Sequence, residues 1–144
     1  MPRITKSAIV PYSDQAMFDL VKDIEHYADF LPWCSGSRIL TETSSEVIGQ
    51  LDISHLGMEQ TFSTRNQLQS PTQMTLELQE GPFDTFQGDW AFSALGEEAC
   101  KVSLVLEFEF SNFLIRAAFG AVFEQIANTL VDSFCQRAKV VYGE

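Results

Sequence analysis

The fold of this protein is decided by residues 113–141, FLIRAAFGAVFEQIANTLVDSFCQRAKVV. The segment lacks proline and has one glycine, Gly120, so it predicts a single helix that spans ~43 Å at 1.5 Å per residue. One face of this helix is polar and carries Glu124, Asn128, Asp132, Gln136 and Lys139. The opposite face is apolar and carries Phe119, Phe123, Ile126, Leu130, Phe134 and Val141. That apolar face needs a cover as long as itself.

The only large element available as a cover is a run of short strands before the helix. Alternation of apolar and polar residues, with turn signals between the runs, indicates strands over 37–43, 47–54, 58–68, 74–78, 85–95 and 102–110. Residues 4–10 add a strand. A helical segment follows, capped by Ser13 and stopped by Pro32. The order predicts an α+β helix-grip fold, with a curved antiparallel sheet of about six to seven strands around the C-terminal helix.

Length and composition limit the possible functions. We expect one domain over residues 1–144. The net charge of −11 disfavours DNA and anionic membranes as partners. Three widely spaced cysteines, Cys34, Cys100 and Cys135, indicate reduced thiols in the cytoplasm. The N-terminus shows no signal-peptide core, and no run of 18 apolar residues predicts a membrane span.

Inward-facing aromatic residues predict a cavity between sheet and helix. In GPFDTFQGDWAF, residues 81–92, three aromatic side chains share one face with Gly88. We expect Gly49 and Gly88 to leave gaps on inward positions, and Ala118, Gly120 and Ala121 to thin the helix. A solidly packed core is the alternative. The expected ligand-binding residues are Phe62, Thr64, Asn66, Phe86, Trp90, Phe92, Phe108, Phe119, Phe123, Ile126 and Leu130.

Such a cavity suits a lipid with one polar end. Each five-carbon isoprene unit contributes roughly 3–4 kcal/mol on burial, before the ordering cost of the tail. Gln60, Thr64 and Asn66 share the parity of Phe62 and are placed to donate hydrogen bonds to a carbonyl oxygen, or else to meet water at the rim. His55 is a further candidate donor if it does not lie on the surface.

The FLPWC segment at 30–34 is a candidate gate. Phe30, Leu31 and Trp33 flank a proline, so they either cover the cavity mouth or plug the core. Cys34 adjoins them as a loop or gate residue.

No catalytic residue is predicted. A Gly-x-Ser-x-Gly motif is absent, and turn or outward positions explain Asp84 and Asp89. No spacing joins His26 or His55 to Cys34 in a metal motif. We therefore expect a non-enzyme that requires neither metal nor cofactor. A cyclase-like enzyme stays open as an alternative, because substrate shaping alone needs no motif.

Several segments together resemble a known superfamily. They are PRITKSAIVPYS (2–13), FLPWC (30–34), FSTRNQL (62–68), AFGAVF (118–123) and RAKVVY (137–142). The chain resembles the START-like, polyketide-cyclase-like superfamily and, within it, the coenzyme Q-binding protein family. The resemblance implies a START/Bet v 1-like fold, no catalysis, and a cavity for ubiquinone or a similar isoprenoid lipid. It implies a carrier or chaperone supporting respiration, cytoplasmic or peripheral at the inner membrane, with transient membrane contact.

Bacterial relatives in this family imply a second function. The resemblance implies that a protein of this kind could act as a ribosome association toxin, which binds the large ribosomal subunit and blocks subunit joining. Arg137 and Lys139 are the candidate ribosome contacts. Their position in the last turns of the helix has a simpler explanation, because cations there stabilise the negative end of the helix dipole.

Overall fold

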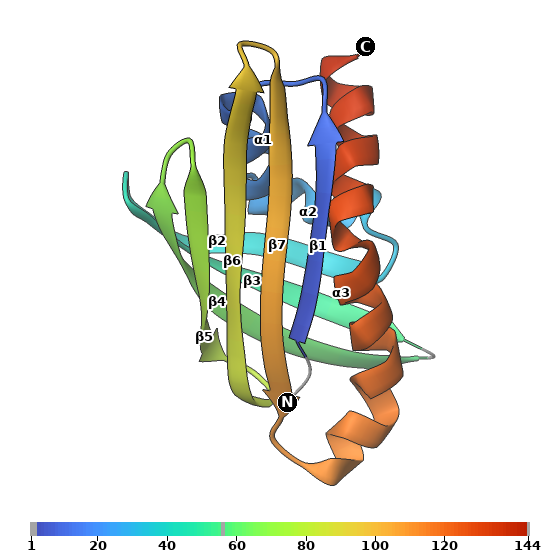
Figure 1. The fold of residues 1–144 in the computed structure, drawn as a ribbon. Helices are drawn as coiled ribbons and strands as arrows, with labels where there is room; N and C mark the ends of the chain where they lie inside the picture. Colours follow the sequence, from blue (N-terminus) through green and yellow to red (C-terminus); the bar gives the residue numbers. More distant parts are fainter. Residues whose placement is uncertain (1–2, 56, 144) are drawn as a thin grey trace.

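The computed structural model, which describes residues 3–55 and 57–143, has one antiparallel sheet bent around a long C-terminal helix (Figure 1). The seven strands follow the order β1-β7-β6-β5-β4-β3-β2. Their bounds are β1 (Arg3–Val10), β2 (Cys34–Glu42), β3 (Glu46–His55), β4 (Met58–Gln69), β5 (Gln73–Glu80), β6 (Phe83–Gly96) and β7 (Ala99–Phe110). The predicted α+β helix-grip fold is confirmed.

The first helical segment is broken into three pieces, where the sequence predicts one. They are α1 (Asp14–Lys22), the short 3-10 helix η1 (Ile24–His26) and α2 (Tyr27–Phe30). Ser13 caps α1 as predicted, because its Oγ accepts a hydrogen bond from the Ala16 N–H at 3.0 Å. Asp23 ends α1 with a ψ of 66°, outside the helical range. The break turns Ile24 onto the sheet.

Helix α3 (Phe113–Tyr142) contributes one buried face to the core, opposite the sheet. Asn112 caps it, since its Oδ1 accepts a hydrogen bond from the Ile115 N–H at 2.9 Å. Its buried face consists of Phe119, Phe123, Ile126, Ala127, Val131, Phe134 and Ala138. Val141, predicted on this face, is 48% exposed. The last turn is held instead by Tyr142, whose hydroxyl donates to the Ala16 carbonyl at 2.8 Å.

The length and composition of α3 are also those of a helix that could cross a membrane. In this fold, packing on the sheet accounts for the apolar residues of its inner face. Its exposed large apolar residues lie at the two ends, with Phe113 and Leu114 at the first turn and Val140 near the last.

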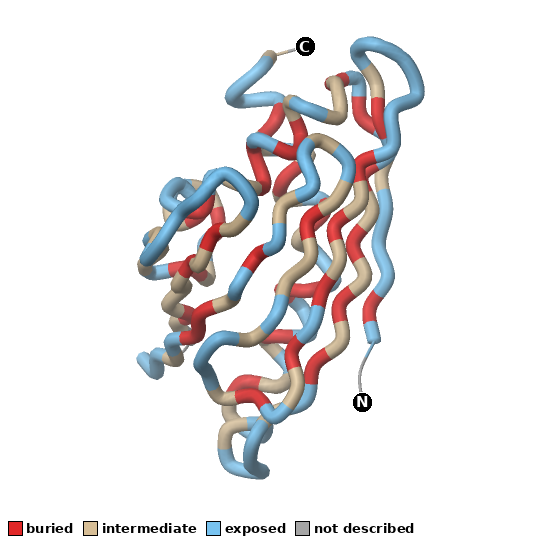
Figure 2. The backbone as a smooth tube through the Cα atoms, turned by 90° about the vertical axis from the view of Figure 1, so that its left-hand side faces the viewer, coloured by how far each residue is buried: buried red, intermediate tan, exposed pale blue. Residues whose placement is uncertain are grey.

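Buried side chains form two clusters along α3. Buried positions alternate with intermediate or exposed ones along β6 and β7 in Figure 2, as a sheet with one covered face requires. In the first cluster, the Phe134 ring lies 5.4 Å from Trp90, 5.2 Å from Tyr27 and 5.3 Å from Phe30, measured between ring centroids. The second cluster is rich in phenylalanine and includes Phe62, Phe83, Phe86, Phe108, Phe119 and Phe123.

The glycines on inward positions do not leave the predicted gaps. A Cβ on Gly88 would lie 2.9 Å from Leu106 Cδ1 and 3.2 Å from Leu76 Cδ1, because these leucine side chains of the two flanking strands lie over Gly88. A Cβ on Gly49 would lie 2.6 Å from Ile24 Cδ1. The expectation of gaps was wrong because large neighbours fill both side-chain positions, although the backbone of Gly49 still lines the cavity described below.

The small residues at the start of α3 do not enlarge the interior either. Gly120 and Ala121 line a surface groove between α3 and the end of β7, together with Phe110 and Arg116. Ala118 packs against the phenylalanine-rich cluster.

We predict that Phe134→Ala destabilises the protein by about 3–5 kcal/mol, because it removes a ring that three aromatic side chains contact. The free energy of unfolding in urea measures this loss. Leu114→Ala, a truncation of an exposed residue on the same helix, should change it by about 0.5 kcal/mol or less. Equal effects of the two truncations would contradict the placement of Phe134 in the core.

Candidate ligand-binding site

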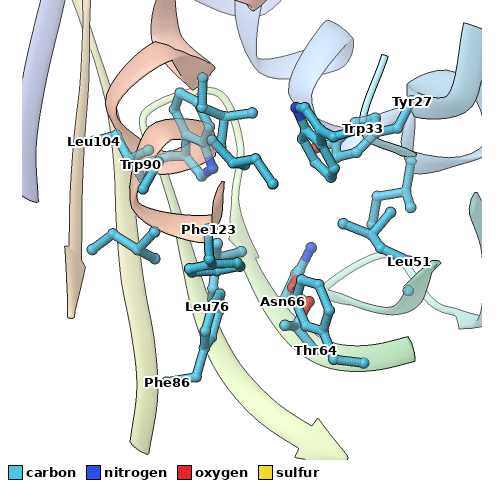
Figure 3. A pocket seen from close by; sticks show the side chains of 17 residues that line it. Tyr27, Trp33, Leu51, Thr64, Asn66, Leu76, Phe86, Trp90, Leu104 and Phe123 are labelled. Carbon is cyan, nitrogen blue, oxygen red and sulfur yellow. Dashed lines mark hydrogen bonds between the residues drawn. The ribbon is translucent and has the colours of Figure 1, made fainter. Parts of the chain in front are cut away.

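A cavity of about 70 Å³ lies between the concave face of the sheet and α3 (Figure 3). Strands β3 to β7, the segment after Ile24 and the middle of α3 all contribute to its walls. Its lining consists of Ile24, Tyr27, Trp33, Gly49, Leu51, Phe62, Thr64, Asn66, Leu76, Phe86, Trp90, Leu104, Leu106, Phe123, Ile126, Ala127 and Leu130.

The periodicities of strand and helix bring these residues together. Phe62, Thr64 and Asn66 are two apart on β4, so all three face inward. On α3, the wall residues follow the spacing of one helix face, and they are Phe123, Ile126, Ala127 and Leu130. Trp90 enters from β6 and belongs to the first core cluster.

Eight of the eleven predicted ligand-binding residues line this cavity; their role in binding stays a prediction. The three that do not are Phe92, Phe108 and Phe119. The Phe18 ring, from α1, covers Phe92 in a T-shaped contact with 5.7 Å between the ring centroids. Phe108 packs on the Phe123 ring at 4.8 Å, and Phe119 lies in the same cluster. These residues have the predicted parity but lie where other side chains fill the interior.

Sequence reasoning missed several wall residues. Leu51, Leu76 and Leu104 have inward parity on predicted strands, so alternation was the signal that could have identified them. Ala127 lies four residues after Phe123 and three before Leu130, so helical periodicity could have identified it, whereas Tyr27 had no such signal.

The polar groups of the cavity are few and uncharged. Thr64 Oγ1 donates a hydrogen bond to Asn66 Oδ1 at 2.8 Å. The Tyr27 hydroxyl donates to the Val21 carbonyl, and burial raises the pKa of Tyr27, so this group stays protonated. No Asp, Glu, Lys, Arg or His lines the cavity within the part of the chain that the structure describes. The site therefore suits a neutral, mostly apolar molecule.

The size of the cavity limits its ligand. Its volume is half that of an engineered cavity of about 150 Å³ that binds benzene. Pockets for larger ligands measure roughly 300–1,000 Å³. An isoprenoid tail therefore requires displacement of part of the wall.

One of the three predicted gate residues lies at the cavity. Trp33 is half-buried in its wall, and its carbonyl accepts a hydrogen bond from the Ser54 N–H at 3.0 Å. Leu31 is 1% exposed within the first core cluster, because the chain turns inward where α2 ends. Phe30 faces an outer groove beneath Arg137. The expectation of a gate formed by all three was therefore wrong for Phe30 and Leu31.

Other candidate polar residues lie away from the cavity. Gln60 lines a surface groove beside Pro82. His26 is exposed, and a hydrogen bond to Asp23 at 2.7 Å raises its pKa. The side chain of His55 lies outside the described residues.

Asp84 is exposed at the start of β6, and Asp89 lies half-buried on the outer face of the sheet.

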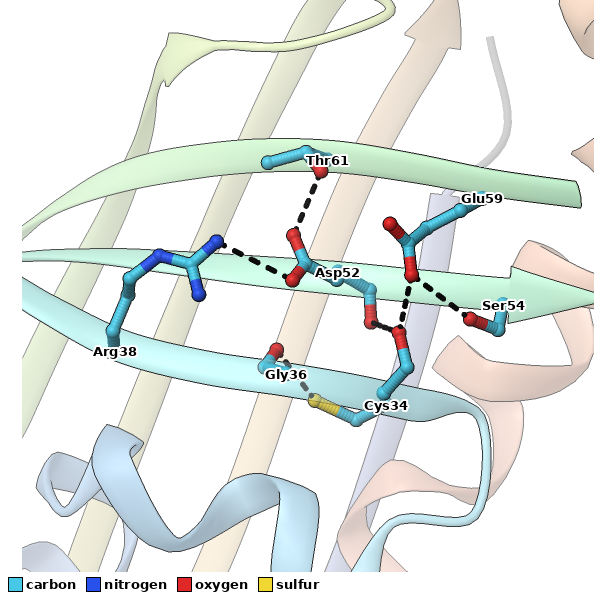
Figure 4. A network of polar contacts seen from close by, with 8 residues as sticks. Cys34, Gly36, Arg38, Asp52, Ser54, Glu59 and Thr61 are labelled. Carbon is cyan, nitrogen blue, oxygen red and sulfur yellow. Dashed lines mark hydrogen bonds and ion pairs between the residues drawn. The ribbon is translucent and has the colours of Figure 1, made fainter.

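Cys34 is placed for structure. Its thiol is buried and donates to the Gly36 carbonyl, with 3.2 Å between Sγ and O (Figure 4). Burial raises the pKa of this thiol to about 11, so the nucleophilic thiolate is scarce at neutral pH.

Nearby, Asp52 bridges three strands, since it pairs with Arg38 at 3.3 Å and accepts from Thr61 at 2.7 Å.

The two predicted ribosome contacts differ in their surroundings. The Arg137 guanidinium lies 5.1 Å above the Phe30 ring, in a groove that also contains four carboxylates, from Asp19, Asp23, Glu25 and Glu42. Lys139 is exposed, and next to it Val140 is 76% exposed. Lys139 is therefore the more accessible cation.

Solved structures share this architecture. The Zhui aromatase/cyclase from Streptomyces sp. R1128 is similar with a TM-score of 0.82, over 96% of this chain and 95% of that one, at 17% sequence identity. At this identity the likeness concerns the fold.

Sequence comparisons identify closer relatives. The chain is 46% identical to the ribosome association toxin RatA of Pseudomonas aeruginosa, over 97% of both chains. It is 22% identical to the mitochondrial coenzyme Q-binding protein COQ10 homolog B of Xenopus laevis, over 96% of this chain and 59% of the relative. Residues 10–135 match the family described as polyketide cyclase / dehydrase and lipid transport. The chain therefore belongs to the polyketide cyclase / dehydrase and lipid transport family, and within it to the group of the ribosome association toxins.

Proposed function

We propose that this protein associates with the large ribosomal subunit and blocks subunit joining. The observation that carries the proposal is the 46% identity to a ribosome association toxin over 97% of both chains. The 22% identity to the coenzyme Q-binding relative supports a lipid carrier less strongly. The small volume of the cavity also favours the ribosome function over the lipid-carrier function, because a carrier needs a cavity large enough to enclose its lipid. This function places the protein in the cytoplasm.

The C-terminal end of α3 is the surface that we assign to the ribosome. Lys139 is exposed there beside Val140, at 76% exposure, and Val141, at 48%. A cation beside apolar side chains can contact a phosphate and bury apolar area in the same interface. The remaining surface is strongly acidic, since the net charge is −11, so a cationic contact has to be local.

This function requires no catalysis. Blocking subunit joining needs only that the protein occupies a surface that the other subunit must meet. The raised pKa of the Cys34 thiol and the uncharged cavity are consistent with a protein that acts by binding.

We predict that the purified protein, mixed with separated ribosomal subunits, sediments with the large subunit and reduces the fraction of joined ribosomes. The double variant Lys139→Glu/Val140→Asp should bind about tenfold more weakly, because it removes a cation and an exposed apolar contact. Binding of the unmodified protein should also weaken with salt if Lys139 meets a phosphate.

The matched control is Arg116→Glu/Leu114→Asp, which makes the same kind of change at the other end of α3, where Leu114 is 77% exposed. This control should bind as the unmodified protein does. Equal losses in both double variants would reject the C-terminal end as the contact surface, and absence of any sedimentation with ribosomes would reject the function.

A second candidate function is the binding of an apolar small molecule in the cavity. It is supported by the uncharged lining of the cavity and by the coenzyme Q-binding relative. An isoprenoid lipid such as ubiquinone fits this function if Trp33, the half-buried wall residue, moves aside.

We predict that Ala127→Met fills the cavity and changes the free energy of unfolding by about 1 kcal/mol or less, since space is available. Ala138→Met is the matched control, because Ala138 is equally buried on α3 but lies in the packed core outside the cavity. It should destabilise the protein by about 1–3 kcal/mol. Urea unfolding of the two variants measures the difference.

The same pair of variants tests ligand binding. Solvent extraction of the purified protein, followed by mass spectrometry, should find an apolar molecule with the unmodified protein and with folded Ala138→Met, and none with Ala127→Met. Absence of such a molecule from all three proteins would count against this second function.

A further inference from the structure

The cavity contains hydrogen-bond donors that face an otherwise apolar interior. Asn66 is 3% exposed and Trp90 is 2% exposed, and both line the cavity. Figure 3 shows the Asn66 amide nitrogen directed toward the middle of the cavity, with the Trp90 indole on the facing wall. The two donors come from β4 and β6, on opposite sides of β5.

The Asn66 amide has an acceptor that is engaged and donors that are poorly satisfied. Its Oδ1 accepts a hydrogen bond from Thr64 Oγ1 at 2.8 Å, which fixes the orientation of the amide. Its Nδ2 has one partner in the described chain, Met74 Sδ at 3.9 Å. A thioether is a weak acceptor, so this buried donor keeps most of its capacity to bind an oxygen atom.

The other polar groups lead to the same preference. The Tyr27 hydroxyl donates to the Val21 carbonyl, and the Thr64 hydroxyl donates to Asn66. The indole of Trp90 is a donor without acceptor capacity. Within the described residues, the N–H groups of Asn66 and Trp90 are therefore buried donors of the cavity that keep capacity for a ligand oxygen.

We propose that the cavity selects a neutral, apolar molecule carrying a carbonyl oxygen, and that Asn66 is the residue that determines this specificity. The proposal rests on the second candidate function, ligand binding in the cavity. The carbonyl oxygen accepts from Asn66 Nδ2, while Thr64 is a positioning residue that holds the amide. A charged ligand is excluded, because no ionised side chain lines the cavity to compensate its loss of water.

Two small probes of the same shape test this proposal, butanone and 2-methyl-1-butene. Both have five non-hydrogen atoms, and they differ in a carbonyl oxygen against a methylene group. Each is smaller than benzene, as a 70 Å³ cavity requires. Titrations are followed in ¹H–¹⁵N spectra, which report the side-chain amide of Asn66 and the indole N–H of Trp90. Asn128, whose exposed amide donates to the Glu124 carbonyl at 2.9 Å, is the internal control.

We expect butanone to shift the Asn66 amide signals and 2-methyl-1-butene to leave them nearly unchanged, with no shift at Asn128. The variant Asn66→Leu keeps a similar side-chain volume without the donor. It should lower the ratio of butanone affinity to 2-methyl-1-butene affinity about fivefold. The ratio is used because the difference in hydration between the two probes cancels between the variant and the unmodified protein.

The outcomes separate the proposal from the function on which it rests. If both probes bind but the affinity ratio is the same in Asn66→Leu, the carbonyl preference is wrong and ligand binding stands. If neither probe binds the unmodified protein, ligand binding fails and the preference fails with it. If Asn66→Leu does not fold, Thr64→Val provides the second measurement. This change keeps the shape of the side chain and removes the hydroxyl that holds the Asn66 amide, so it should lower the same ratio, and an unchanged ratio would overturn the proposal.

Discussion

The structure depends on the burial of one face of α3 by the concave side of the sheet. Thirty residues of helix cannot keep so many large apolar side chains in water, and no other element is long enough to cover them. The sheet must therefore bend along the helix. The residues that face inward on β3 to β7 then form the core. The residues that face outward form a polar surface with networks such as Arg38–Asp52–Thr61.

The cavity exists because the buried side chains form two clusters along α3. Aromatic rings gather around Phe134 in one cluster and around Phe83 and Phe123 in the other. Between them α3 presents Ala127, which is too small to reach the sheet. A hollow remains at the junction, and two of the polar side chains at its wall, Thr64 and Asn66, are hydrogen-bonded to each other. Relatives with this fold have different functions, since function depends on sites rather than on the fold.

The two candidate functions use different parts of the same helix. The inner face of α3 forms a wall of the cavity, while the exposed end around Val140 is available to a large partner. The functions are therefore compatible in one molecule. A ligand that presses on Leu130 would act on the helix that carries the outer surface.

The elements and their faces could be predicted from the residues alone, because the periods of strand and helix depend on local geometry. That pattern predicted the Ser13 cap, the strands, the long helix and eight of the cavity residues. Which inward residues meet empty space depends on how the folded elements pack. Phe92 and Phe108 have the parity of Trp90 but lie under other rings, and Ile24 fills the place beside Gly49. The position of a residue along a strand predicts which side of the sheet its side chain faces. Which side chains cover it depends on segments that are distant in the sequence, and their positions depend on packing.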